Sequence, residues 1–225
     1  MNQRKIQQHD QALHLGSLIG NKHSQGNVKK ASNDLYFRTN LLMSNFAHCS
    51  VDVITSLFSS YCTSFYGSPL FKLSELDPLL LAWRKCIKKI YKLNIRTRSI
   101  YVAHLMPLDL INMLTIRFLN FVLFCVTSSN RIVNFVANLN VKDIVFQNLI
   151  FISEKYNVEI RAPCQIDKNY VKNVIAHVKE FNNAPYDHYV SALAIKDLCK
   201  YRDKIVEISS VDYNDVKFLF SFFTL

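Results

Sequence analysis

The chain has little glycine and little proline, which turn-rich folds and phosphate-binding loops both need. Its 225 residues contain four glycines and five prolines. A β-sandwich needs a turn about every 8 to 12 residues, so this composition argues against one and indicates long regular elements. Neither G-x-x-x-x-G-K-[ST] nor G-x-G-x-x-G occurs in the sequence, which argues against the two commonest kinds of nucleotide-binding loop.

Clustered acidic residues are missing as well. No two aspartates are adjacent, and the acids stand singly, as at Asp77, Asp109 and Asp143. A metal-dependent polymerase or nuclease needs converging carboxylates, and the seven dispersed histidines offer no zinc-ligand spacing. Hydrolase signatures are absent too. We therefore expect no catalytic residue, no metal site, no cofactor and no small-molecule substrate, and do not predict an enzyme.

Paired cysteines and long apolar runs are also lacking. Six scattered cysteines without a C-x-x-C pair favour free thiols in a reducing compartment. The polar start MNQRKIQQHD does not resemble a signal peptide, so we expect an intracellular protein, nuclear or cytoplasmic and not secreted. The most apolar run, FLNFVLFCV at 118–126, is much shorter than the roughly 20 residues of a membrane span. It predicts a buried core helix and no membrane association.

What the chain does have is helical periodicity, which predicts a mainly α fold. A short strand is predicted over 13–20, followed by a turn at 21–26. Ser50 and Asp77 are predicted helix N-caps, with Pro78 at the first helical position. Residues 131–165 are compatible with a helix or a strand. The predicted helices cover residues 27–46, 50–65, 77–93, 107–127, 168–181, 193–205 and 216–223.

Positive charge is concentrated in one segment. The formal net charge is +10, which suits a polyanionic partner such as nucleic acid or an anionic membrane face. The stretch WRKCIKKIYKLNIRTRS at 83–99 carries seven basic side chains and no acidic one. Within it, Trp83, Ile87, Ile90 and Tyr91 lie on one helical stripe, which we assign to the core. Trp83 is therefore expected to pack inside and not to stack on a base.

The basic side chains of this segment are the candidate binding residues. They repel one another, and a phosphate backbone passing nearby would relieve that repulsion and release counterions. A solvated face that complements the helix dipole is the alternative interpretation. The predicted nucleic-acid-binding residues are Arg84, Lys85, Lys88, Lys89, Lys92, Arg96 and Arg98, with Lys29, Lys30 and Arg38 as weaker candidates.

Five segments occur in an order that resembles a known family. They are HLGSLIGNK, LLMSNFAHCSVDVITSLFSSYCTSFYGSPLF, AWRKCIKKIYKL, IRFLNFVLFCVTSSNRIVNFV and AIKDLCKYRD. Together they resemble the carboxy-terminal part of reverse transcriptases from non-LTR (LINE-type) retrotransposons, over roughly residues 13–225. In these RNA-directed DNA polymerases the thumb grips the template–primer duplex largely through its backbone, which agrees with the basic segment.

The resemblance implies a division of the chain. It assigns a divergent tail to 1–12, a remnant of the last palm strand to 13–27, a helical thumb to 28–100 and a carboxy-terminal helical region to 101–225. The chain also departs from the family. The catalytic aspartates of the family lie upstream of HLG, where this sequence has unrelated residues, and there is no zinc knuckle. Asn94 and Arg98 stand where the family often has Pro and His.

The resulting hypothesis is a reverse-transcriptase fragment without the catalytic palm. Such a fragment would at most bind nucleic acid through the backbone, without catalysis and independently of sequence. Two alternatives stay open. The chain could be an inert transposon remnant, or a helical protein-interaction module whose partner docks on the face left by the missing palm.

Overall fold

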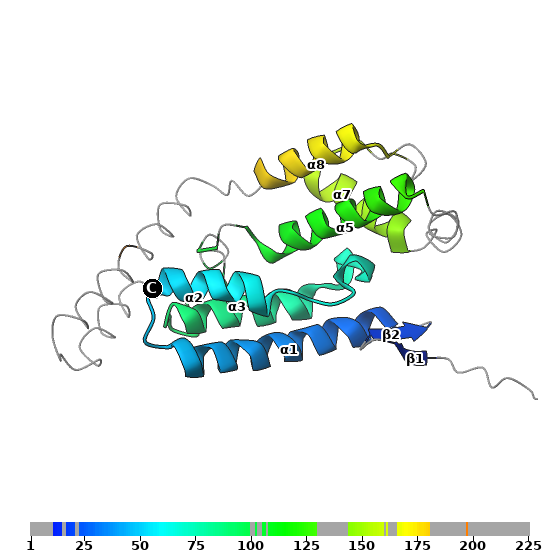
Figure 1. The fold of residues 1–225 in the computed structure, drawn as a ribbon. Helices are drawn as coiled ribbons and strands as arrows, with labels where there is room; N and C mark the ends of the chain where they lie inside the picture. The colour runs from blue at the N-terminus through cyan, green and yellow to red at the C-terminus, as the bar shows by residue number, and fades with distance from the viewer. Residues whose placement is uncertain are drawn as a thin grey trace, which may run out of the picture.

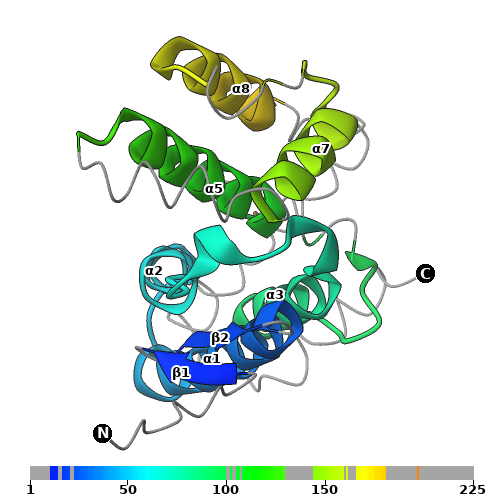
Figure 2. The ribbon, with the colours of Figure 1, turned by 90° about the vertical axis from the view of Figure 1, so that its right-hand side faces the viewer.

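The computed structural model describes residues 11–14, 17–20, 23–99, 102, 105–106, 108–129, 144–159, 161, 166–180 and 197. These residues are mainly helical, as the sequence predicts, and they form three tiers (Figure 1). A β-hairpin and α1 make the first tier, α2 and α3 the second, and α5, α7 and α8 the third (Figures 1 and 2). The helices predicted over 193–205 and 216–223 lie outside the described residues, Asp197 excepted.

The N-terminal β segment differs from the prediction. Two antiparallel strands, β1 (Gln11–His14) and β2 (Ser17–Gly20), replace the single strand expected over 13–20. The pairing sets Gln11 opposite Gly20 and His14 opposite Ser17, and β1 begins inside the predicted tail. One straight strand and a hairpin of two short strands show the same alternation of apolar and polar residues. The sequence pattern therefore could not distinguish the two structures.

Helix α1 (His23–Phe46) begins four residues before the predicted start. Part of the expected turn at 21–26 is helical instead. The N–H groups of a first helical turn need no partner within the helix, so polar residues and a glycine can join it at little cost. The helix buries one stripe against the rest of the fold, made of Val28, Ala31, Leu35 and Leu42.

The helix predicted over 50–65 is two elements. Helix α2 (Val51–Leu57) continues as a π-helix, η1 (Phe58–Cys62). Ser50 does stand at the N-cap position with an extended backbone, but its hydroxyl makes no capping hydrogen bond. The predicted break after this helix is confirmed: Gly67 has a φ of 71°, which favours glycine, and precedes the short 3-10 helix η2 (Ser68–Leu70).

Helix α3 (Asp77–Ile90) carries the basic segment and begins at the predicted residue, but Pro78 is its second residue and not its first. Leu76 is the N-cap residue and Asp77 lies in the first turn, so the prediction of Asp77 as the cap is wrong. Leu76 is held there by burial, since only 1% of it is exposed. The Asp77 carboxylate still stands where negative charge complements the helix dipole.

The end of α3 comes three residues earlier than the predicted end at residue 93. Lys92 has a φ of 51°, the left-handed conformation that stops a helix. The Leu93 N–H donates to the Lys88 carbonyl at 2.8 Å, and the Lys92 N–H donates to the Lys89 carbonyl at 3.1 Å. This pair of bonds is a Schellman motif, and it turns the chain sharply after Tyr91.

Three further helices complete the described fold: α5 (Leu110–Thr127), α7 (Ile144–Tyr156) and α8 (Lys168–Glu180). The ambiguous region 131–165 is thus helical over 144–156. The predicted core helix at 118–126 is confirmed within α5, which buries Phe118, Leu119 and Val122. Helix α5 is long and apolar enough to cross a membrane by length and composition alone, and half of that stretch is buried inside the protein.

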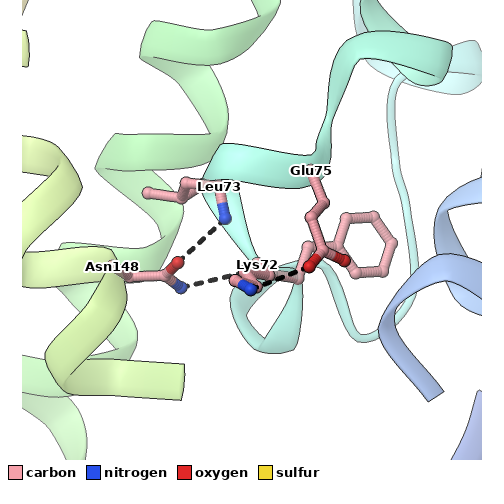
Figure 3. A network of polar contacts seen from close by, with 5 residues as sticks. Lys72, Leu73, Glu75 and Asn148 are labelled. Atoms are coloured by element: carbon pink, nitrogen blue, oxygen red, sulfur yellow. Dashed lines mark hydrogen bonds and ion pairs between the residues drawn. The ribbon is translucent and has the colours of Figure 1, made fainter. Parts of the chain in front are cut away.

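One continuous apolar core joins all three tiers, from Val28 on α1 to Val178 on α8. A polar tie crosses it between α7 and the segment before α3 (Figure 3). The buried Asn148 amide donates to the Phe71 carbonyl at 2.9 Å and accepts from the Leu73 N–H at 2.8 Å. Both backbone groups are satisfied inside the core. The cysteines that the structure describes are free thiols, namely Cys49, Cys62, Cys86 and Cys125.

Candidate nucleic-acid interface

The apolar stripe of α3 faces the core, as its spacing predicts. Trp83 is 1% exposed, and Ile87, Ile90 and Tyr91 are buried with it. The Tyr91 hydroxyl donates to the Leu105 carbonyl at 3.0 Å. Trp83 therefore has no face on which a base could stack, and the binding residues must come from the rest of the helix.

Lys88 lies inside the fold and not on the predicted exposed face. It is only 9% exposed, and its ammonium donates to the Ile95 carbonyl at 2.9 Å. Burial lowers the Lys88 pKa, and the nearby charges of Arg84 and Lys85 lower it further. The Lys88 ammonium is thus turned towards the backbone of Ile95, which leaves it less accessible to a phosphate backbone than the exposed Lys85 and Lys89. This side chain instead fastens the turn after α3 back onto the helix.

Arg84 is half-buried on the side of α3 within electrostatic reach of α5 and α7. Its Nε atom is buried and has no hydrogen-bond partner. The pKa of Lys155 on α7 is lowered by burial and by Arg84, and Asp109 at the start of α5 opposes that shift. One Asp109 carboxylate oxygen is also buried without a hydrogen-bond partner. Arg84 thus belongs to a half-buried group of charges with Asp109 and Lys155, and the charge pattern of the sequence did not single out Lys155.

Lys85 and Lys89 lie exposed on the other side of α3, one helical turn or about 6 Å apart. The Lys89 ammonium donates to Oδ1 of Asn40 on α1 at 2.6 Å. Helices α1 and α3 pack side by side (Figures 1 and 2). Lys85 has no ion-pair or hydrogen-bond partner among the residues that the structure describes. These two lysines follow the seam between the helices.

The turn after α3 continues this positive surface. Lys92, Arg96 and Arg98 are exposed. Asn94 shapes the turn, because its side-chain oxygen accepts from the Arg96 N–H at 2.9 Å and its carbonyl accepts from the Thr97 N–H at 3.0 Å. An asparagine that bonds the backbone two residues on is a common turn former. Asn94 thus closes the turn that follows α3.

The weaker candidates on α1 also differ in whether they are exposed or packed against the fold. Lys29 and Lys30 are exposed. Arg38 is half-buried and donates to the carbonyl oxygens of Tyr61 and Ser64, at 3.3 and 2.9 Å. Its guanidinium also lies 5.7 Å from the centre of the Tyr61 ring. Arg38 therefore ties α1 to η1 and the residues after it through its Nη1 atom.

Residues that the charge pattern did not single out lie next to this surface. Asn33, Phe37 and Asn40 are exposed on α1, and Asn40 contacts Lys89. A helical wheel could have found Phe37, because this aromatic residue stands outside the buried stripe through Val28, Leu35 and Leu42. No local pattern could have indicated the Asn40–Lys89 bond, since it joins residues 49 positions apart.

No protein-family model matches the chain, and no curated protein and no solved structure matches it either. Within the described ranges, no three His, Cys, Asp or Glu residues gather where they could hold a metal ion. The exposed cationic surface along α3 is the best-defined candidate site. We call it the basic edge and define it by its five members: Lys85, Lys89, Lys92, Arg96 and Arg98.

Proposed function

We propose that the chain binds nucleic acid through the phosphate backbone, without catalysis and without sequence preference. In this proposal it is the thumb and following helical region of a LINE-type reverse transcriptase. The resemblance in segment order supports the family, and the basic edge supports the binding. The observation that carries the proposal is the exposure of five cations within a segment, 84–98, that contains no acidic residue.

The charge arrangement favours a polyanion over a simply solvated face. Lys85 and Lys89 are like charges at i and i+4, a spacing that destabilises a helix by a few tenths of a kcal/mol. Acidic residues on α1 could have relieved this repulsion, but the α1 residue that contacts Lys89 is the neutral Asn40. A phosphate backbone along the seam between α1 and α3 would neutralise both lysines and release its counterions.

A charge reversal on the basic edge tests the proposal directly. The variant is Lys85→Glu with Lys89→Glu, and the matched control is Lys168→Glu with Lys172→Glu on α8. The control pair is also exposed and has the same i, i+4 spacing, so both variants change the net charge equally. Binding of a labelled RNA–DNA duplex is measured between about 50 and 200 mM salt. We expect the first variant to bind at least about tenfold more weakly, with a salt slope about 2 smaller, and the control to stay near the parent.

Equal losses in the two variants would mean that net charge alone drives association, and would reject the basic edge as a site. Parent protein that does not bind duplex or single strands would reject the nucleic-acid role. A helical protein-interaction module would then be the better proposal. Tyr66 and Leu70 are large side chains exposed in the segment between η1 and α3, and this favours that alternative.

A further inference from the structure

The outer face of α1 presents an aromatic ring beside the basic edge. Phe37 is 69% exposed, more than any other aromatic residue in the part of the chain that the structure describes. Residues three, four and seven apart share one face of a helix, so Asn33, Phe37 and Asn40 form a row. The bond from Lys89 to Asn40 joins this row to the basic edge.

The side chains around Phe37 are mostly amide and cationic, although Asp34 three residues before it and the exposed Leu41 four residues after it also lie nearby. Lys29 stands one turn before Asn33, and Lys30 lies on the same outer surface. The nearest acidic residue on the helix, Asp34, is half-buried one turn before Arg38, on the flank that faces η1. A single exposed apolar residue is normal on a protein surface. An exposed ring bordered by lysines and asparagines is also the composition of a single-strand binding surface.

We infer that the basic edge and the Asn33–Phe37–Asn40 row together hold single-stranded nucleic acid, with one base stacked on Phe37. The phosphates on either side of that base lie against Lys85 and Lys89. This inference rests on the proposed function and deepens it by naming the form of nucleic acid. The bases of a duplex already stack on one another, so an exposed ring reaches a base without unstacking cost only in a single strand.

Other aromatic residues are less suited to this role. Trp83 is buried. Tyr61 is exposed, but the Arg38 guanidinium lies over its ring. Phe124 is 63% exposed but lies on α5, in the tier farthest from α1 (Figure 1). Phe37 thus combines an open ring with neighbouring cations, and Phe124 serves as its matched control.

Binding of oligothymidylate is compared with binding of an abasic strand of equal length and equal charge. The full chain is tested as the parent, as Phe37→Leu and as Phe124→Leu. We expect the parent to prefer the strand that has bases, and Phe37→Leu to bind that strand roughly fivefold to tenfold more weakly. Phe37→Leu should bind the abasic strand as the parent does. Phe124→Leu should match the parent on both strands.

A spectroscopic test locates the base. Trp83 is the single tryptophan of the chain and is buried, so Phe37→Trp adds one exposed reporter. We expect oligothymidylate to quench this added fluorescence and the abasic strand to leave it unchanged. Phe124→Trp, the control, should not respond to either strand. Retained or tighter binding by Phe37→Trp would support a ring that stacks, because tryptophan offers a larger aromatic face.

The outcomes separate the two proposals. If reversal of Lys85 and Lys89 weakens binding while Phe37→Leu does not, and thymidylate and abasic strands bind equally, backbone binding stands and stacking on Phe37 is rejected. Loss of binding to strands with bases in Phe37→Leu but not in Phe124→Leu supports the inference. If the parent binds no nucleic acid, both proposals fail, and Phe37 with its neighbour Leu41 becomes a protein-docking surface.

Discussion

Helix α3 carries two basic pairs with the same spacing and opposite environments. Arg84 and Lys88 form one pair at i and i+4, and Lys85 and Lys89 form the other, displaced by one residue. One residue is a rotation of about 100° on a helix. The first pair lies against the rest of the fold, with Lys88 only 9% exposed, whereas the second faces solvent along α1. A count of charges treats the four side chains alike, but their positions give them different roles.

The inward pair is tolerated because the fold accommodates its charge. The Lys88 side chain is largely buried, and its ammonium reaches the Ile95 carbonyl. Arg84 lies within electrostatic reach of both Asp109 and Lys155. By bonding to Ile95, Lys88 holds the turn that carries Arg96 and Arg98. The inward pair therefore builds part of the surface to which the outward pair belongs.

Charge reversal at Lys88 and at Lys85 should give the largest difference in the free energy of unfolding between two variants. Lys88→Glu places a carboxylate in a largely buried position opposite a carbonyl oxygen, and we expect it to lower the free energy of unfolding by about 3 kcal/mol or more. Lys85→Glu changes an exposed side chain and should shift it by less than about 0.5 kcal/mol. Urea denaturation followed by circular dichroism measures both.

Lys88→Met separates packing from charge in the same experiment. Methionine keeps most of the stem and loses the hydrogen bond, so we expect an intermediate loss of about 1 kcal/mol. Equal destabilisation by Lys88→Glu and Lys85→Glu would mean that the two pairs share one environment, contrary to the burial of Lys88.

Helix α7 ends in a buried tyrosine, Tyr156, whose ionisation should weaken the fold. Burial raises the pKa of Tyr156 to about 12 from an ordinary value of 10, and the charge of Asp109 contributes to the rise. Between these pH values the unfolded chain loses the proton and the folded chain keeps it. The stabilising contribution is therefore complete below pH 10 and is lost as the pH rises towards 12, by about 2 kcal/mol or more.

Tyr156→Phe should remove this dependence. At neutral pH the variant loses the hydrogen bond from the tyrosine hydroxyl to Asn112, at 2.7 Å, and should be about 1 kcal/mol less stable. Because the parent loses about 2 kcal/mol over this range and the variant does not, the difference should shrink as the pH rises from 10 and reverse in sign by about pH 11.5. Ionisation of the buried Cys86, whose pKa is raised to about 11, occurs in both proteins and cancels in the comparison. A constant difference across this range would contradict the expected Tyr156 titration.

Much of this fold follows from local pattern, whereas the candidate site depends on contacts between distant residues. The apolar stripe through Trp83 and Ile87 predicts which side of α3 is buried, because helical period alone decides it. The fate of Lys88 depends on how the chain turns at Lys92 and returns over the helix. The bond from Lys89 to Asn40 depends on α1 lying parallel to α3. Helical periodicity does not predict either contact. The exposed pair Lys85 and Lys89 therefore could not be distinguished from the packed pair Arg84 and Lys88 by sequence alone.

The smallest expected change in stability comes from Lys92, a residue of the basic edge at which stability and binding should change in opposite directions. Lys92 adopts a φ of 51°, which costs a residue with a side chain about 1 kcal/mol and costs glycine little. Lys92→Gly should therefore raise the free energy of unfolding by roughly 0.5 kcal/mol while weakening duplex binding through the loss of one cation. Asn157, with a φ of 52° after α7, is the control, since asparagine tolerates this conformation and Asn157→Gly should gain less. If Lys92→Gly lowers both the stability and the affinity, Lys92 serves the fold. If the stability rises while the affinity falls, the charge of Lys92 belongs to the binding surface.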